Sequence, residues 1–259
     1  MYTKSDILKD IALIGIDPKG TLLIHSSMKS IGDVDGKAET VIDAFIEYMK
    51  DGLLIFPTHS WKEDNLLDDI YDPLTEPSCV GILTNLFRKR EGVIRSLHPT
   101  HSVAAIGRDA FDYIEGEEKF STPCPREGCW GRLYDRKAQI LFLGCTLKTN
   151  TYIHSVEEWN NITDRIADKS RKIKIINPYG DDYYLDFYGH HSSHGDVSKN
   201  YDKLLKPFLY KGIVSKGKIG DARSYLCDAV GMADLTTKFL NNDIDLFADD
   251  KSIPADWYR

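Results

Sequence analysis

The stretch RSLHPTHSVAAIG, residues 95–107, joins a turn that carries two histidines to a short apolar run. Pro99 disfavours helix in the turn, and residues 102–106 are apolar enough for a short buried strand. His98 and His101 therefore lie where a loop enters a strand, and a rigid sheet often presents polar groups to a ligand at such a junction. A strand entry with one histidine held by the backbone explains this stretch alone equally well.

Three other segments are predicted to be buried strands that end in polar residues. Residues 21–25 lead into SSMKSIG, residues 53–56 lead into PTHSW, and the most apolar run of the chain, AQILFLG at 138–144, leads toward His154. In open α/β folds, polar residues at neighbouring strand ends converge on one cleft. We therefore expect an α/β protein with its site at one edge of the sheet.

The segments between these strands are less regular. Residues 3–13 predict an amphipathic helix, in which Thr3 and Asp6 have the spacing of a capping box. Residues 65–78 are acidic and contain two prolines, and residues 120–132 are rich in proline and glycine. Both of these stretches are expected to be loops without regular structure.

The C-terminal half begins with a hairpin pattern. Residues 171–188 carry two alternating runs separated by NPYG, which is typical of a β-hairpin. The histidine-rich stretch GHHSSHGDVSKN, residues 189–200, is expected to be a solvated polar loop. Nothing marks a linker, so we expect one domain over residues 1–259, with a hairpin and polar-loop appendage at about 171–200.

Composition limits the classes of partner. The chain has 259 residues, with 33 basic and 40 acidic side chains and a formal charge of -7, which argues against nucleic acid and suits a cationic small molecule. The first residues lack the pattern of a signal peptide, and no run has the length of a membrane span, so we expect a cytoplasmic protein without a membrane partner. Five cysteines without CxxC spacing predict reduced thiols.

One pair of residues has the spacing of a general base and its partner. In HSVEEW, His154 and Glu157 are three residues apart and share a face if the segment is helical. A carboxylate beside an imidazole fixes its tautomer and raises its basicity, as general-base catalysis on an amine requires. Glu158 and Asn161 are local alternatives to Glu157. An exposed ion pair on a helix explains the pair equally simply.

Other catalytic classes find less support. The histidines at 190–194 could complete a metal site with that pair, but HSVEEW is not HExxH and the loop has no acidic residue before Asp196. Cys124 and Cys129 lie in no recognisable nucleophile motif. The absence of GxSxG, a Walker loop and GxGxxG argues against serine hydrolases, kinases and nicotinamide enzymes.

Five longer motifs follow one another along the chain. They are LLIHSSMKSIG (22–32), FPTHSW (56–61), EPSCVGILTNLFRKREGVIRSLHPTHSVAAIG (76–107), TPCPREGCWGRLYD (122–135) and ILFLGCTLKTNTYIHSVEEW (140–159). In this order they resemble the aminoglycoside 3-N-acetyltransferase family. Their order over residues 22–159 is far more specific than any one motif. The remainder, through IGDARSYLCDA, is similar but looser.

The resemblance implies a single-domain α/β/α fold with a central mixed sheet, different from the GCN-type acetyltransferase fold. It implies direct transfer of an acetyl group from acetyl-CoA to an amine in a ternary complex, with His154 as general base and Glu157 orienting it. The cofactor contacts that it implies are Ser26, Ser27, Met28, Lys29, Ser30, Ser102 and Val103. His25, His98 and His101 belong to the motifs, with either catalytic or structural roles.

The resemblance makes an aminoglycoside the first expected acceptor, with antibiotic resistance as the consequence and a homodimer as a possible assembly. An amino sugar, a sugar nucleotide or another biosynthetic amine is the alternative acceptor. A metal-dependent hydrolase or an inert CoA-binding protein is the alternative class, and no metal is expected. Asp64, Asp68 and Asp69 would favour a polycation if they line the cleft. Cys129 replaces a common serine of the family, and the loop after Tyr188 is histidine-rich rather than acidic.

Overall fold

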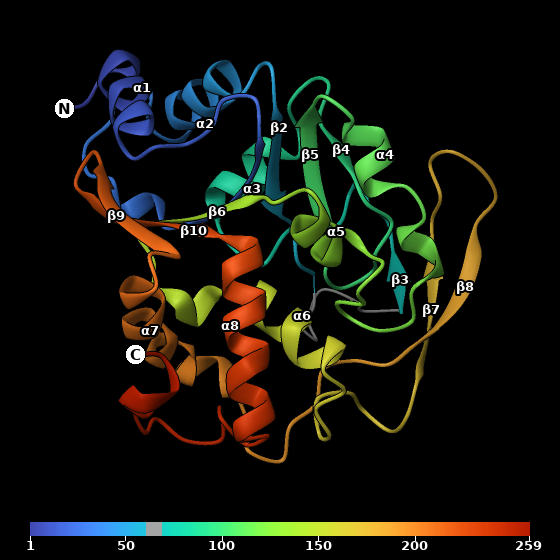
Figure 1. Ribbon diagram of the computed structural model, residues 1–259. Coiled ribbons are helices and arrows are strands. Elements are labelled where there is room, and N and C mark those ends of the chain that lie inside the picture. The colour runs from blue at the N-terminus through green and yellow to red at the C-terminus, as the bar shows by residue number, and fades with distance from the viewer. Residues whose placement is uncertain (61–68) are drawn as a thin grey trace.

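The computed structural model describes residues 1–60 and 69–259, which form a three-layer α/β/α arrangement around a seven-stranded mixed sheet (Figure 1). The strand order is β4-β5-β2-β1-β6-β10-β9. The strands are β1 (Thr21–Ser26), β2 (Leu53–Pro57), β4 (Ile94–Arg95), β5 (Val103–Gly107), β6 (Gln139–Leu143), β9 (Val214–Ile219) and β10 (Ala222–Asp228). Of the neighbouring strand pairs in this sheet, β1–β2 and β1–β6 are parallel and the others are antiparallel. The predicted fold class is confirmed.

Helices cover both faces of the sheet because its strands are apolar on both sides. In β1, Leu22 and Ile24 pack into the core on one face, whereas Leu23 packs into the core on the other. The first core is covered by α1 (Lys4–Leu13), α2 (Lys37–Tyr48) and α3 (Ile82–Phe87), and the second by α4 (Ala110–Ile114), α5 (Cys129–Asp135), α6 (Thr151–Trp159), α7 (Leu205–Tyr210) and α8 (Ala229–Asn242). None of the described helices is both long and apolar enough to cross a bilayer.

Strand direction brings the polar strand exits together. The carboxyl ends of β1, β2 and β6 meet at one edge because these strands are parallel. Strand β5 runs antiparallel to β2, with Val103 opposite Pro57, so the histidine turn before β5 lies at the same edge. This confirms the expected convergence of strand ends.

A second, three-stranded sheet contains β3 (Ile70–Tyr71), β7 (Arg171–Ile175) and β8 (Tyr183–Phe187). The predicted hairpin is confirmed, because β7 and β8 pair in antiparallel register. The expectation of an irregular surface loop over 65–78 is wrong at Ile70–Tyr71, which form β3, whereas 72–78 contain no helix or strand. Tyr71 is fully buried and its hydroxyl donates to the Ser96 carbonyl at 3.1 Å. The short strand β3 forms only because it pairs with β7, far away in the sequence.

The expectation of a loop over 120–132 is wrong at its end, where α5 begins. The backbone N–H of Cys129 donates to the carboxylate of Glu117 at 2.6 Å, so a residue outside the helix caps its first turn. Gly131 also belongs to this helix, and a Cβ there would lie 1.6 Å from the Arg126 carbonyl oxygen. Its glycine marks a close approach of backbone rather than a loop.

Candidate active site

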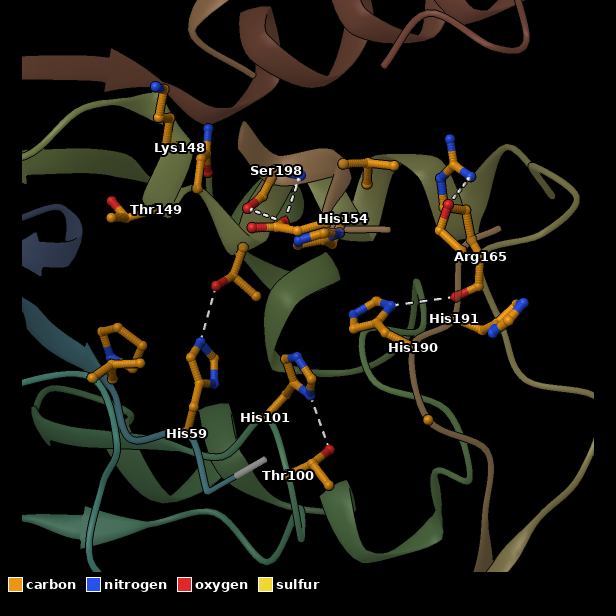
Figure 2. A pocket seen from close by; sticks show the side chains of 18 of the residues that line it. His59, Thr100, His101, Lys148, Thr149, His154, Arg165, His190, His191 and Ser198 are labelled. Atoms are coloured by element: carbon orange, nitrogen blue, oxygen red, sulfur yellow. Dashed lines mark hydrogen bonds between the residues drawn. The ribbon is translucent and has the colours of Figure 1, made fainter. Parts of the chain in front are cut away.

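A cavity of about 970 Å³ opens at the edge where the strand exits meet. Its lining on the sheet side comprises His25, Ser26, Pro57, His59, Thr100 and His101. The 3₁₀ turn η4 (Leu147–Thr149) and the start of α6 add Lys148, Thr149, Asn150, Thr151 and His154. Residues from the loop after β8 close the other side, including His190, His191 and Ser192 (Figure 2).

Neutral histidines form a row along this cavity. Ring centroids lie 4.8 Å apart for His59 and His101, 4.8 Å for His101 and His190, and 4.7 Å for His190 and His154. Burial lowers the pKa of His190 to about 4 and holds those of the other three well below 6.5. The cavity wall therefore offers neutral imidazoles at pH 7.

His98 and His25 differ from this row in their contacts. His98 Nε2 donates to the Thr122 carbonyl at 3.0 Å, and its Nδ1 accepts from the backbone N–H of His101 at 2.9 Å. These bonds fix the turn before β5. His25 lines the cavity, and its ring stacks on Phe142 with centroids 5.2 Å apart.

His154 carries its hydrogen bond on one ring nitrogen. Its Nδ1 lies 2.7 Å from the Tyr201 hydroxyl, and that hydroxyl donates to Glu157 Oε2 at 2.5 Å. A phenol has one proton and a carboxylate only accepts, so the Tyr201 oxygen accepts from Nδ1–H. Nε2 of His154 therefore holds the lone pair. The direct distance from His154 Nδ1 to Glu157 Oε2 is 3.7 Å, so Glu157 reaches the imidazole through Tyr201.

Glu157 is buried with a cation of its own. Its side chain has no exposed surface, and Arg165 Nε donates to its Oε1 at 2.6 Å. Burial raises the pKa of Glu157, and the Arg165 guanidinium opposes that shift. Burial and the Glu157 charge raise the pKa of Tyr201 well above 10, so the phenol stays protonated. A continuous chain of hydrogen bonds thus runs from His154 to Arg165.

The predicted cofactor residues after β1 do not all reach the cavity. Ser26 lines it, whereas Lys29 is exposed and Met28 packs beside the core under α1. In the 3₁₀ turn η1 (Met28–Ser30), the Ser30 hydroxyl donates to the Gly144 carbonyl and accepts from the Ser27 hydroxyl, both at 3.0 Å. Ser27 and Ser30 therefore hold this turn against the end of β6.

The other two predicted cofactor residues, Ser102 and Val103, are buried and do not line the cavity. The Ser102 hydroxyl donates to the Thr58 carbonyl at 2.8 Å and accepts from Arg95 Nε at 3.1 Å. Arg95 in turn donates to the Glu76 carbonyl at 2.6 Å. The cluster ties the start of β5 to the exit of β2.

The structure corrects one expectation about the histidine-rich loop. His190 is not solvated, because it lines the cavity and its Nδ1–H donates to the Arg165 carbonyl at 3.4 Å. His191 and His194 are exposed, as expected. A bridge between Ile166 and His190 draws this part of the loop inward.

The acidic residues named for a polycation are only partly described. Asp64 and Asp68 lie outside the described residues. Asp69 forms an ion pair with Arg171, with 3.1 Å between Oδ1 and Nε. Its charge is therefore shared with a cation that itself lines the cavity.

Several site residues escaped the sequence-based predictions. Tyr201 lies in η5 (Val197–Leu204), 47 residues after His154, and no motif links the two. Arg165 follows α6 in a stretch without a recognised pattern. His59 belongs to the quoted motif FPTHSW, which was a usable signal, and its Nε2 bonds Thr151 Oγ1 at 2.9 Å.

A metal could be considered for one group of side chains, His101, Cys124 and His190, whose ligand atoms lie within 4.8 Å of one another. Ligand atoms on a tetrahedral zinc lie about 3.6 Å apart. Burial also raises the pKa of the Cys124 thiol well above 9, which disfavours the thiolate that a metal needs. The group would have to contract and lose a proton to hold an ion.

Comparison with known proteins adds a family model and curated relatives. The model described as aminoglycoside 3-N-acetyltransferase matches residues 23–241. Aminoglycoside N(3)-acetyltransferase IX of Micromonospora chalcea is 27% identical over 253 residues, covering 88% of this chain and 89% of that protein. The SPbeta prophage-derived aminoglycoside N(3')-acetyltransferase-like protein YokD of Bacillus subtilis is 28% identical over 176 residues, covering 60% of this chain but only 64% of YokD.

A solved structure has the same fold. The apoenzyme of aminoglycoside acetyltransferase AAC(3)-IVa superposes with a TM-score of 0.80, covering 95% of this chain and 91% of that chain. The two sequences are 22% identical, so this likeness concerns the fold. The resemblance inferred from the five motifs is confirmed by the family model.

Proposed function

The chain belongs to the aminoglycoside 3-N-acetyltransferase family, a family of acyltransferases, and from this we propose that it transfers the acetyl group of acetyl-CoA to an amine of an amino sugar. Aminoglycosides, named for its relatives, are the first acceptors to assay, and success with them would make the enzyme a resistance determinant. A sugar nucleotide or another biosynthetic amine is the second acceptor class.

In the proposed reaction, the acceptor amine attacks the thioester carbonyl carbon. The N–C bond forms, the C–S bond breaks, and the amine proton passes through His154 Nε2 to the departing CoA thiolate. The products are an N-acetyl amide and the CoA thiol. The lowered pKa of His154 keeps its imidazole neutral and able to accept a proton near pH 7.

The observation that carries this proposal is the hydrogen-bond chain from His154 through Tyr201 to Glu157. When Nε2 takes a proton, the imidazole becomes positive, and the Glu157 charge stabilises it through the Tyr201 hydroxyl. A solvated helical ion pair does not explain this arrangement, because the Glu157 side chain is fully buried.

We place acetyl-CoA on the side of His154 where Lys148 and Thr149 lie in Figure 2. Lys148 is exposed enough to meet a phosphate, and Ser26 also lines the cavity. Ser27 and Ser30 contribute by holding the turn after β1 in place. For Ser102 and Val103, the buried positions favour support of this wall over direct contact with the cofactor.

The test is CoA thiol release, followed with a thiol reagent, in the presence of acetyl-CoA and a panel of aminoglycosides, amino sugars and sugar nucleotides. We expect His154→Ala to lower kcat by about 1000-fold, with the Kd for CoA unchanged, because the base acts after the cofactor binds. His194→Ala, an exposed histidine outside the cavity lining, is the matched control. Wild-type turnover in His154→Ala would reject the catalytic assignment.

Two other classes give different results in the same assay. A metal-dependent hydrolase would contain stoichiometric zinc and lose activity to a chelator. An inert CoA-binding protein would bind CoA and release no thiol with any acceptor.

A further inference from the structure

Most of the charged side chains that line the cavity are cationic, although the chain as a whole is acidic. The whole sequence has 40 acidic against 33 basic residues. Among the described residues that line the cavity, the cationic ones are Lys148, Arg165, Lys169 and Arg171, and the one carboxylate is Asp196. A cavity lined by one sign of charge concentrates ligands of the other sign.

Most of these charges already have a use within the protein. Arg165 pairs with Glu157 at 2.6 Å, and Arg171 pairs with Asp69 at 3.1 Å. The Asp196 carboxylate accepts from the backbone N–H of Ser198 at 3.0 Å and from its hydroxyl at 2.6 Å, which caps the turn η5.

Lys169 is different, because it is exposed and has no carboxylate within ion-pair distance in the described part of the chain. Its charge is therefore free to meet a ligand.

The two sides of His154 differ in position and, on the proposed function, in occupant. Lys148 and Thr149 lie on one side of His154, and Arg165, His190 and His191 lie on the other (Figure 2). Lys169 and Arg171 also line the cavity. The Ala167 N–H donates to the Gly189 carbonyl and Arg171 pairs with Phe187, so this segment runs beside the chain that leads to His190. With acetyl-CoA on the Lys148 side, the free cation belongs to the acceptor side.

We propose that the acceptor carries a phosphate group in addition to the amine that is acetylated, and that Lys169 binds this phosphate. The inference rests on the proposed function. The acceptor class is then a phosphorylated amino sugar, either a sugar phosphate or a nucleoside diphosphate sugar. A polycation without an anionic group would meet repulsion from Lys169.

The first experiment compares glucosamine with glucosamine 6-phosphate, which have the same amine and differ by one phosphate. We expect kcat/KM in the thiol-release assay to be about tenfold higher for the phosphate at low salt, and this advantage to shrink in 0.5 M NaCl. A nucleoside diphosphate amino sugar and kanamycin complete the panel. The nucleoside diphosphate amino sugar distinguishes a nucleotide-linked phosphate from a sugar phosphate, and kanamycin is the polycation.

Each outcome decides something. Higher kcat/KM for glucosamine or kanamycin than for both phosphorylated acceptors overturns the inference and leaves the proposed function intact. If no thiol is released with any of these acceptors, both the inference and the proposed function are wrong.

The second experiment removes the free cation. Lys169→Ala should raise KM for the phosphorylated acceptor about tenfold and leave KM for acetyl-CoA unchanged. Lys172→Ala is the matched control, since Lys172 is also exposed but does not line the cavity. If Lys169→Ala instead raises KM for acetyl-CoA, the basic side holds the cofactor and the inference is wrong.

Discussion

Arg95 and Arg165 are both almost completely buried, with 5% and 3% of their surface exposed, but their partners differ in kind. Among the described residues, the guanidinium of Arg95 donates only to neutral oxygens, which are the carbonyls of Thr58, Pro73 and Glu76 and the hydroxyls of Thr58 and Ser102. Arg165 donates to the Glu157 carboxylate, which reaches the His154 imidazole through Tyr201.

The different partners of Arg95 and Arg165 show that a buried arginine can support either the fold or the catalytic site. Arg95 gathers backbone from three segments and also lies over the Tyr71 ring, 5.3 Å from its centroid, so it fixes the strand exits beside the cavity. Arg165 compensates a buried charge that acts on the base. Loss of the Arg95 contacts should therefore lower the free energy of unfolding, and loss of the network of Arg165 and Glu157 should lower kcat.

The largest effect is expected from Arg95→Met. The change leaves buried carbonyl and hydroxyl oxygens without donors, so the free energy of unfolding should fall by about 3 kcal/mol, measured by urea unfolding. Arg90→Met is the control, because Arg90 is 31% exposed and pairs with Glu39 and Asp43 near the surface. We expect that control to lose less than about 1 kcal/mol. Equal losses in the two variants would contradict a special role for Arg95.

The next effect tests the Arg165 network. Glu157→Gln keeps the shape and a hydrogen-bond acceptor for Tyr201 but removes the negative charge, so kcat should fall about 100-fold. Glu158→Gln is the control. Glu158 accepts from Thr122 and from the Cys124 backbone, away from the base, and kcat should stay within about twofold. An undiminished kcat in Glu157→Gln would show that its charge does not act on His154.

Only parts of these two networks could be predicted from the sequence. Strands β2 and β5, which lie beside the Arg95 cluster, are apolar runs, and the His154–Glu157 pair lies within one turn of a helix, so both were predicted. Strand β4, which contains Arg95 itself, was not predicted. Tyr201 was not, because its contact with α6 depends on how η5 packs after a polar loop. A pattern read along the chain carries no information about such a contact.

Helix α5 was not predicted, for a related reason. Its glycines and nearby prolines are typical of a loop, and the group that caps its first turn is the carboxylate of Glu117, 12 residues earlier. His190 shows the same limit, since the serines and glycine around it predict solvent exposure. Its bridge to Ile166 draws it into the cavity wall.

A smaller effect separates positioning from structural support at Tyr201. Tyr201→Phe removes the hydroxyl that links His154 to Glu157, and at 3.7 Å the two cannot bond directly, so kcat should fall about tenfold. KM for acetyl-CoA should not change. Tyr183→Phe is the matched control, because the Tyr183 hydroxyl is buried and has no hydrogen-bond partner in the part of the chain that the structure describes. A change in stability alone, with kcat preserved, would make Tyr201 a packing residue.

The smallest effect concerns His25, which lines the cavity and stacks on Phe142. Burial lowers the pKa of His25 from 6.5 to about 3, so below pH 6.5 the unfolded chain binds a proton that the folded protein does not. The stability contributed by neutral His25 is therefore present above pH 6.5 and lost as the pH falls. Between pH 7.5 and 5.5 the loss is about 1.4 kcal/mol.

His25→Phe should remove that amount from the pH dependence of urea unfolding, whatever it does to stability at pH 7.5. Phe142→Leu disturbs the same stack, whose centroids lie 5.2 Å apart, without removing a titratable group, and should keep the wild-type dependence. If His25→Phe keeps the dependence as well, then His25 is protonated in the folded state at pH 5.5. The wall of the cavity would in that case carry charge where burial predicts a neutral imidazole.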